Sequence, residues 1–130
     1  MKNIATKNLT SLLMVLAIAA PTAAYGQQTT RPVTGTSGGS QTSADCGFIP
    51  DKPDYSFSIG PSATSVSIEV SGSGDHTLLM LGPDNSRECI LAHDFDGGII
   101  QSRGLYKPGN YELYVGDIDG AGADFSLNLR

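Results

Sequence analysis

From Asp54 to the end of the chain, apolar and polar residues alternate with a period of two, and this pattern constrains the fold more than any other feature. A period of two places every second side chain on one face, as in a half-buried β-strand. No stretch of eleven residues carries an apolar stripe at helical spacing. The pattern predicts an all-β protein with strands at residues 55–59, 66–70, 78–81, 87–92, 99–101, 111–115 and 125–129.

Turn-forming sequences separate these segments. Residues 82–85 place Pro83 second in the turn, which favours type I, whereas residues 107–110 read Pro then Gly in the middle, as a type II turn requires. The run at 78–81 is wholly apolar, so we expect this strand to be covered on both faces. Short strands at spacings of about 8–12 residues are typical of an antiparallel β-sandwich, here of about seven to eight strands.

The first 26 residues have the order of a secretory signal peptide. Lys2 and Lys7 are followed by the apolar run 12–20, and the small-x-small pattern of residues 24–26 predicts cleavage after Gly26. The run is too short to cross a membrane, which needs about 20 apolar residues. We therefore predict a signal peptide at 1–26, no membrane span, and a secreted or periplasmic mature protein.

Residues 27–44 are rich in Gly, Ser, Thr and Gln, and Val33 is their one large aliphatic residue. Such a segment buries too little apolar surface to offset the entropy of ordering, so we predict a disordered, flexible linker. Its run 35–39 matches the G-x-S-x-G pattern of hydrolase nucleophiles, but no predicted strand precedes it and no predicted helix follows it. We interpret this match as coincidence and assign residues 45–130 to one β-sandwich domain.

The chain is acidic, with 13 Asp and Glu against 8 Lys and Arg and a formal net charge of −5. Removal of residues 1–26 takes away two lysines and no acid, which changes the balance to 6 − 13 = −7. A chain of this charge is poorly suited to nucleic acid or anionic lipid, so we expect neither as a partner.

Cys46 and Cys89 are the two cysteines of the chain. In an oxidising compartment an even count favours a disulfide, which here would stabilise the fold by about 4 kcal/mol in the chain-entropy model. The alternatives are a reactive thiol or a metal pair. Neither cysteine lies in a C-x-x-C motif or beside a basic cluster, so we predict the disulfide.

Little in the sequence points to catalysis. His76 and His93 lie beside Asp75 and Asp94, and we interpret both as solvated turn histidines. A Ser-His-Asp triad can be drawn, but Ser and Asp are so abundant here that the match is uninformative. With the cysteines in a bridge, too few ligands remain for a structural zinc site. We therefore predict no catalytic residues and no enzyme activity.

Two acidic loops are the candidates for a metal site. Asp94 and Asp96 lie in one loop and Asp117 and Asp119 in another, with Asp124 nearby. Ca²⁺ binds six to eight oxygens from carboxylates and carbonyls, although neither loop has EF-hand spacing. If the loops meet at one end of the sandwich, they could hold calcium. The simpler interpretation is that each Asp suits a turn.

Two aromatic residues are candidates for ligand contact. If Tyr111, Leu113 and Val115 face the core, Tyr114 lies on the opposite face of its strand, and Phe95 lies in an acidic loop. An outward aromatic ring can stack on a sugar or anchor a protein partner. The absence of Trp weakens the sugar interpretation, and a lone tyrosine is also ordinary on a half-covered sheet.

Taken in order, several segments resemble a known family. Residues 108–115 resemble the P-G-x-Y-x-L/V-x-V strand of bacterial pre-peptidase C-terminal domains, and residues 54–57 resemble its opening strand. Asp75 with residues 78–84 resembles the D-x-x-L-x-L-x-G-P segment, and residues 125–129 resemble the closing strand. The cysteine pair is similar to the version found in secreted cyanobacterial proteins.

The resemblance implies a jelly-roll-like β-sandwich over about residues 46–130 that is not itself catalytic. Such domains accompany secreted peptidases and other exported proteins, are associated with binding structural proteins or polysaccharides, and in some cases bind Ca²⁺. No peptidase domain accompanies this sequence, so we expect no accessory role to a catalytic domain in the same chain.

These observations together predict an exported, non-catalytic binding or adhesion module for an extracellular protein or polysaccharide. The alternative is a calcium-stabilised structural or cell-surface component that assembles with partners through a sheet edge. A hydrolase is less favoured than either. The oligomeric state does not follow from the sequence.

Overall fold

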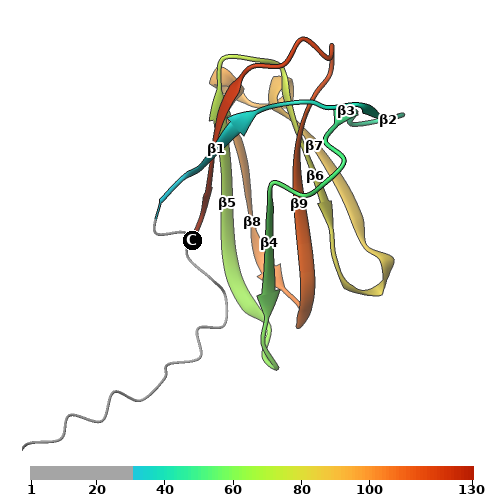
Figure 1. Ribbon diagram of the computed structural model, residues 1–130. Helices are drawn as coiled ribbons and strands as arrows, with labels where there is room; N and C mark the ends of the chain where they lie inside the picture. Colours follow the sequence, from blue (N-terminus) through green and yellow to red (C-terminus); the bar gives the residue numbers. More distant parts are fainter. Residues whose placement is uncertain (1–30) are drawn as a thin grey trace, which may run out of the picture.

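The structure is a computed structural model that describes residues 31–130, and it is a sandwich of two antiparallel β-sheets (Figure 1). The four-stranded sheet has the order β1-β10-β5-β8. The six-stranded sheet has the order β2-β3-β9-β6-β7, with β4 also paired to β9. The predicted all-β antiparallel sandwich is confirmed. The predicted signal peptide at 1–26 lies outside the described residues.

The described part of the chain contains ten strands and three single-turn 3-10 helices. The seven strands expected from the sequence correspond to β4 through β10, and β1 through β3 were not predicted. Within residues 31–130, no helix is long and apolar enough to span a bilayer. The elements are β1 (Val33–Thr36), β2 (Gln41–Ser43), β3 (Gly47–Ile49), β4 (Tyr55–Ile59), β5 (Thr64–Gly72), β6 (His76–Leu81), η1 (Pro83–Asn85), β7 (Arg87–Leu91), η2 (Ala92–Asp94), η3 (Asp96–Gly98), β8 (Ile100–Tyr106), β9 (Gly109–Asp117) and β10 (Asp124–Leu129).

The core fills the space between the two sheets. Alternate residues of each strand point inward, so Ile68, Leu113 and Leu127 are fully buried between them. Aromatic rings close one part of this core: Phe57 stacks on Tyr111 with ring centroids 5.0 Å apart. Burial of alternate apolar side chains supplies the main favourable free energy of such a fold.

Strand β6 is buried on both faces, as its apolar run predicted. Leu78 and Met80 belong to the core, whereas Leu79 faces the other way and is nevertheless only 4% exposed. On that outer side, the Thr77 hydroxyl donates a hydrogen bond of 2.8 Å to the carbonyl of Cys46. The segment around Cys46 therefore covers the outer face of β6.

The prediction of a flexible linker over 27–44 is wrong for its described part, residues 31–44. Strand β1 pairs with β10 along four residues, from Val33 opposite Leu127 to Thr36 opposite Asp124, and β2 pairs with β3. Backbone hydrogen bonds hold β1 to the sheet, and Val33 is the one large apolar side chain of β1 that packs against the core. The composition argument left the backbone contribution out. The folded domain therefore begins at Val33 and not at residue 45.

The two predicted turns have different outcomes. Residues 82–85 do not form a type I turn, because Asp84 and Asn85 adopt left-handed conformations with φ of 59° and 57°. Asp and Asn tolerate this region better than most residues, which explains how the sequence accommodates it. For the type II turn predicted at 107–110, Gly109 has the positive φ expected of its third residue, 141°, but this value departs from the value of about +80° in a type II turn, and Gly109 begins β9.

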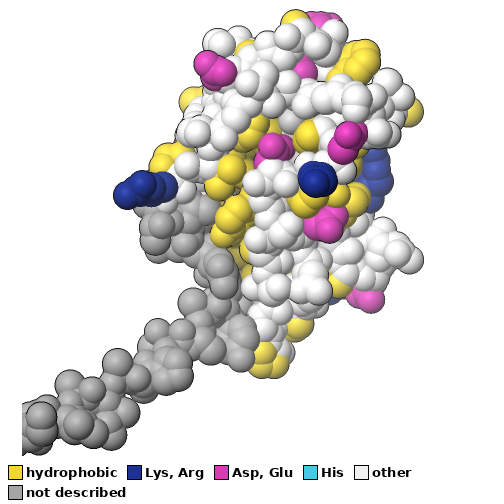
Figure 2. All heavy atoms as spheres, viewed as in Figure 1, with side chains coloured by type: hydrophobic (Ala, Val, Ile, Leu, Met, Phe, Trp, Pro, Cys, Tyr) yellow, Lys and Arg dark blue, Asp and Glu magenta, His cyan; other side chains and the backbone are white. Residues whose placement is uncertain are grey.

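The surface in Figure 2 shows how the acidic residues are distributed on one face. Asp and Glu side chains lie apart from one another on this face, and apolar side chains are visible along its middle and in smaller groups toward its edges. The net negative charge is therefore spread over this face and is not gathered into one acidic patch there.

Candidate functional site

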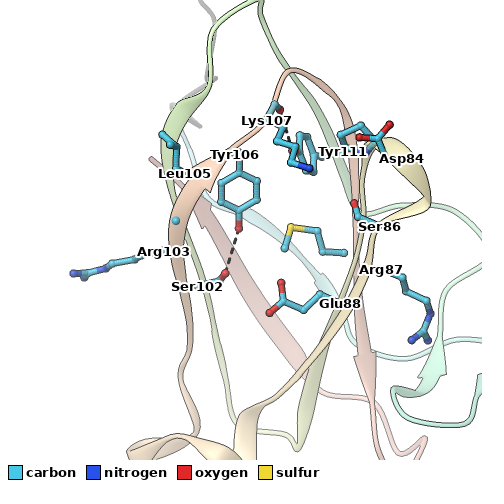
Figure 3. Close-up of a pocket in the computed structure, with 13 residues that line it drawn as sticks. Asp84, Ser86, Arg87, Glu88, Ser102, Arg103, Leu105, Tyr106, Lys107 and Tyr111 are labelled. Carbon is cyan, nitrogen blue, oxygen red and sulfur yellow. Dashed lines mark hydrogen bonds between the residues drawn. The ribbon is translucent and has the colours of Figure 1, made fainter.

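A cavity of about 670 Å³ lies between strands β7 and β8, and we call it the edge groove (Figure 3). These strands end their respective sheets, because β8 pairs with β5 alone and β7 pairs with β6 alone among the described strands. The sandwich is thus open along this flank. The groove is lined by Met80, Pro83, Asp84, Ser86, Arg87, Glu88, Ser102, Arg103, Gly104, Leu105, Tyr106, Lys107 and Tyr111.

The inner wall of the edge groove is apolar with two hydroxyl groups. Met80 and the rings of Tyr106 and Tyr111 belong to the core and form this wall. The hydroxyls of Ser102 and Tyr106 lie 3.2 Å apart and share a hydrogen bond. Burial raises the pKa of Tyr106 above its ordinary value, so its hydroxyl stays protonated near neutral pH. The wall can therefore contact both apolar and hydrogen-bonding groups of a ligand.

The charged residues of the groove point in different directions. Glu88 points across the groove toward Ser102, whereas Arg87 and Arg103 point away from it (Figure 3). Arg87 forms a two-point ion pair with Asp45, with N–O distances of 2.6 and 2.7 Å. This pairing lowers the pKa of the Asp45 carboxyl through its hydrogen bonds to Arg87 and Ser43. Glu88 forms no ion pair with any of residues 31–130.

The backbone of β8 is also available along this flank. Ser67 exchanges both of its backbone hydrogen bonds with Arg130, at 2.7 and 2.8 Å. Because hydrogen bonding alternates along an antiparallel strand, the residues on either side of Ser67 bond to β8, at Ser102 and Gly104. The N–H and C=O groups of residues 101, 103 and 105 then point away from β5 toward the open edge. They can accept a further strand.

A second polar arrangement lies at the end of the sandwich where β9 turns into β10, and we call Ser37, His76 and Asp117 the buried polar cluster. His76 is completely buried and Asp117 is 3% exposed, and the two residues lie opposite each other in β6 and β9. Neither ring nitrogen of His76 has a hydrogen-bond partner among residues 31–130. The interpretation of His76 as a solvated turn histidine is therefore wrong.

The hydroxyl of Ser37 is engaged and cannot act as a nucleophile in this arrangement. It accepts a hydrogen bond from the backbone N–H of Ala123 at 3.0 Å and donates to the Asp117 carboxylate at 3.4 Å. Ser37 is only 4% exposed, so a substrate has no access to it. The G-x-S-x-G match at 35–39 thus covers the end of β1 and the segment after it and is not a nucleophile elbow, which requires an exposed hydroxyl next to a base.

The two acidic loops lie at the same end of the sandwich (Figure 1). They are connected through Asp75, whose side chain lies 3.4 Å from His93 and whose carbonyl accepts from the N–H of Ile118 at 3.1 Å. The carboxylate of Asp117 turns inward and also accepts from the N–H of Asp119 at 3.0 Å.

The four predicted calcium ligands differ in their exposure, since Asp117 is buried. Asp94, Asp96 and Asp119 are exposed. No group of three or more His, Cys, Asp or Glu side chains in residues 31–130 is arranged to hold a metal ion. Calcium binding stays a prediction, and melting temperatures in EDTA and in millimolar Ca²⁺ test it.

The two aromatic candidates lie apart from the edge groove. Tyr114 is half buried, and its hydroxyl donates to Glu112 at 2.7 Å. Burial and the Glu112 carboxylate raise the pKa of Tyr114 to about 12. Phe95 is half buried and packs against the core, so most of its ring is not available to a ligand. Contact of either residue with a ligand stays a prediction.

The predicted disulfide is confirmed. Cys46 and Cys89 are bridged with a Cα–Cα distance of 5.8 Å, within the range of native disulfides. The bridge fastens the segment that covers β6 to the neighbouring strand β7. It therefore holds the outer layer of the six-stranded sheet in place.

The sequence did not identify the edge groove. The groove lies between β7 and β8, and its lining also includes residues of β6, η1 and β9, which are not all neighbours in the sequence. One signal was present: Glu88 and Ile90 are two residues apart, so a charged side chain shares a strand face with a partly buried one. A charge at an inward strand position is typical of sheet edges.

Comparisons with known proteins support a family and a fold. No family model matches the chain. An uncharacterized protein of Synechococcus elongatus is 36% identical over 101 residues, which cover 75% of this chain and 72% of that protein. The crystal structure of a pre-peptidase C-terminal domain, from a collagenase of Bacillus anthracis, is similar with a TM-score of 0.51 and 21% identity, covering 77% of this chain and 90% of that domain. The chain therefore belongs to the same family as the Synechococcus protein, and its sandwich has the fold of a pre-peptidase C-terminal domain.

Proposed function

We propose that the protein is an exported, non-catalytic module that binds an extracellular protein or polysaccharide in the edge groove. The observation that carries this proposal is the groove itself, a cavity of about 670 Å³ between two free strand edges. Its apolar wall, its pair of hydroxyls and the Glu88 carboxylate, which has no ion pair within residues 31–130, provide the few polar contacts and the apolar surface that are typical of binding sites.

The arrangement of the histidines supports a non-catalytic role. His76 is enclosed, and exposed His93 lies near carboxylates at 3.4 and 3.7 Å without a serine or cysteine beside it in the described chain. Nucleophilic catalysis requires a base within hydrogen-bond distance of an accessible nucleophile. The groove itself contains hydroxyls but no histidine.

The disulfide supports export, because such bonds persist mainly in oxidising compartments. The solved domain of similar fold belongs to a collagenase. By analogy, extracellular protein is the first partner class to test, followed by polysaccharide.

A blocking substitution tests the site. A Cβ at Gly104 would approach only Tyr106, at 3.8 Å, so Gly104→Trp can fill the groove without disturbing the backbone. Ser56→Trp is the control, because Ser56 is exposed on β4, which pairs with β9 on the side of the six-stranded sheet away from β7. Both variants and the wild type are screened against immobilised extracellular proteins and glycans, with melting temperature as the folding check.

We expect Gly104→Trp to abolish binding to the captured ligand and Ser56→Trp to retain it. Equal binding by all three proteins would show that the groove is not the binding site. Loss of binding by Ser56→Trp alone would assign the site to the outer face of the six-stranded sheet and would also contradict the proposal.

A further inference from the structure

Strand β8 pairs with β5 on one side, and its other edge has no neighbouring strand among the described residues. Residues 101, 103 and 105 present their main-chain groups outward, and β8 is seven residues long, about 24 Å at the rise of an antiparallel strand. An extended peptide of about five residues can pair with these groups. In such strand addition, main-chain hydrogen bonds provide affinity, and alternate side chains provide specificity.

One charge facing this edge is not compensated. Glu88 pairs in register with Met80 on the inner side of β7, and its carboxylate points across the groove (Figure 3). The nearby cations are directed elsewhere: Arg87 is paired with Asp45, Arg103 points outward, and Lys107 lies at the Tyr111 end of the groove. An inward charge of this kind discourages docking by an apolar strand edge. A cationic side chain would instead compensate it.

We propose that the edge groove binds an extended, basic peptide segment of an extracellular protein, which adds to β8 as a fifth strand and places a lysine or arginine side chain against Glu88. This inference rests on the proposed function and specifies its ligand. Side chains on one face of the peptide contact Met80 and Tyr106 together with Glu88. Side chains on the other face lie beside Leu105, which is 74% exposed on the outer side of β8.

The test uses a synthetic probe and the folded protein. The probe is an acetylated and amidated seven-residue peptide of alternating threonine and valine whose central valine is replaced by lysine, so that lysine and two valines share one face. Binding is followed by amide chemical shifts in solution. We expect the largest shifts and slowed amide exchange at residues 101, 103 and 105.

Variants of both partners isolate the two parts of the inference. Glu88→Gln should weaken binding of the lysine peptide about two- to fivefold, the range of an exposed ion pair. Glu112→Gln is the matched control, since Glu112 lies on the outer face of the six-stranded sheet, and it should bind as the wild type does. A peptide with glutamate in place of lysine should bind less well to the wild type and better to Glu88→Lys. Methylation of the peptide nitrogens that would donate to β8 should abolish binding.

Three outcomes would overturn the inference. Equal affinity for the lysine and glutamate peptides would remove the role of Glu88, and full binding by the methylated peptide would remove strand addition. Capture of a polysaccharide but no peptide, with sensitivity to Gly104→Trp, would contradict the peptide ligand and leave the proposed function intact. A ligand insensitive to Gly104→Trp would contradict the proposed function itself.

Discussion

Two regions of the molecule differ in whether their polar groups are buried or face an open cavity. In the buried polar cluster, Ser37 and Asp117 are shielded from water and bond to each other and to the backbone. In the edge groove, Glu88 and the outer main-chain groups of β8 face an open cavity. The first region attaches the N-terminal strand to the sandwich, and the second can accept a partner. Substitutions in the first should therefore change stability, and substitutions in the second should change binding.

The largest expected effect is on the covered side of the six-stranded sheet. Replacing both cysteines, Cys46→Ala with Cys89→Ala, should lower the free energy of unfolding by about 4 kcal/mol, because the bridge closes a loop of separation 43 in the unfolded chain. Urea unfolding measures this change. Gly104→Trp, on the open flank, is the comparison and should change stability far less. A loss below about 1 kcal/mol for the cysteine variant would show that the segment around Cys46 stays packed on β6 without the disulfide.

A glycine at the end of the edge groove should give the next largest effect. Gly109→Val should lower the free energy of unfolding by about 2–3 kcal/mol, because φ is 141° and a Cβ would lie 2.7 Å from that of Pro83. Gly104→Val is the control, as its Cβ has room. The same urea titration compares them. Equal stability of the two variants would contradict the strain argument.

The buried polar cluster should respond more weakly. Ser37→Ala leaves the Ala123 N–H and one oxygen of Asp117 without their partner, so we expect a loss of about 1–2 kcal/mol. Ser126→Ala, on the outer face of β10, should be nearly neutral. Hydrogen exchange gives a sharper test, since the amides of β1 should lose protection first in Ser37→Ala. Unchanged protection of the β1 amides would show that the hydrogen bonds of Ser37 do not hold β1 in the sheet.

The smallest effect is a dependence of stability on pH. Burial lowers the pKa of His76, against the opposing influence of Asp117 and Asp75, below its ordinary value of 6.5. Below pH 6.5 the unfolded chain then binds more protons than the folded one, so this residue makes stability rise with pH up to about 6.5 and level off above it. Urea unfolding at pH 5, 6, 7 and 8 measures the slope. His76→Asn should reduce this slope; an unchanged slope in this variant would assign the pH dependence to other groups.

The strands from β4 onward could be predicted because their side chains alternate and their burial depends on that alternation. The predicted sandwich and disulfide follow from the same local information together with the cysteine count. Strands β1 to β3 could not be predicted in this way, because pairing with β10 and β9 and hydrogen bonds such as that of Ser37 to Asp117 hold them. The hydrogen-bond partners of Ser37, which directly follows β1, are 80 or more residues away in the sequence.

The two candidate sites were predictable to different extents. That the acidic loops lie at the same end follows from sandwich topology, but the inward turn of Asp117 depends on Ser37 and Asp119, which no spacing rule reveals. His76 was misjudged for a similar reason: its position at a strand start suggested solvent, and residues 72–74 and β9 enclose it. The edge groove depends on which strands end the two sheets, and strand order is a long-range property.

The pairing of β1 with β10 has a mechanical consequence. Val33, where the chain enters β1, lies opposite Leu127, close to the end of β10. Tension between these two points acts on one end of the ladder, so the four residue pairs separate in succession and not all at once. Strand β1 would yield first and lengthen the connection to whatever precedes it. The bridge between Cys46 and Cys89 would then keep the enclosed loop from extending, so the rest of the sandwich carries the load.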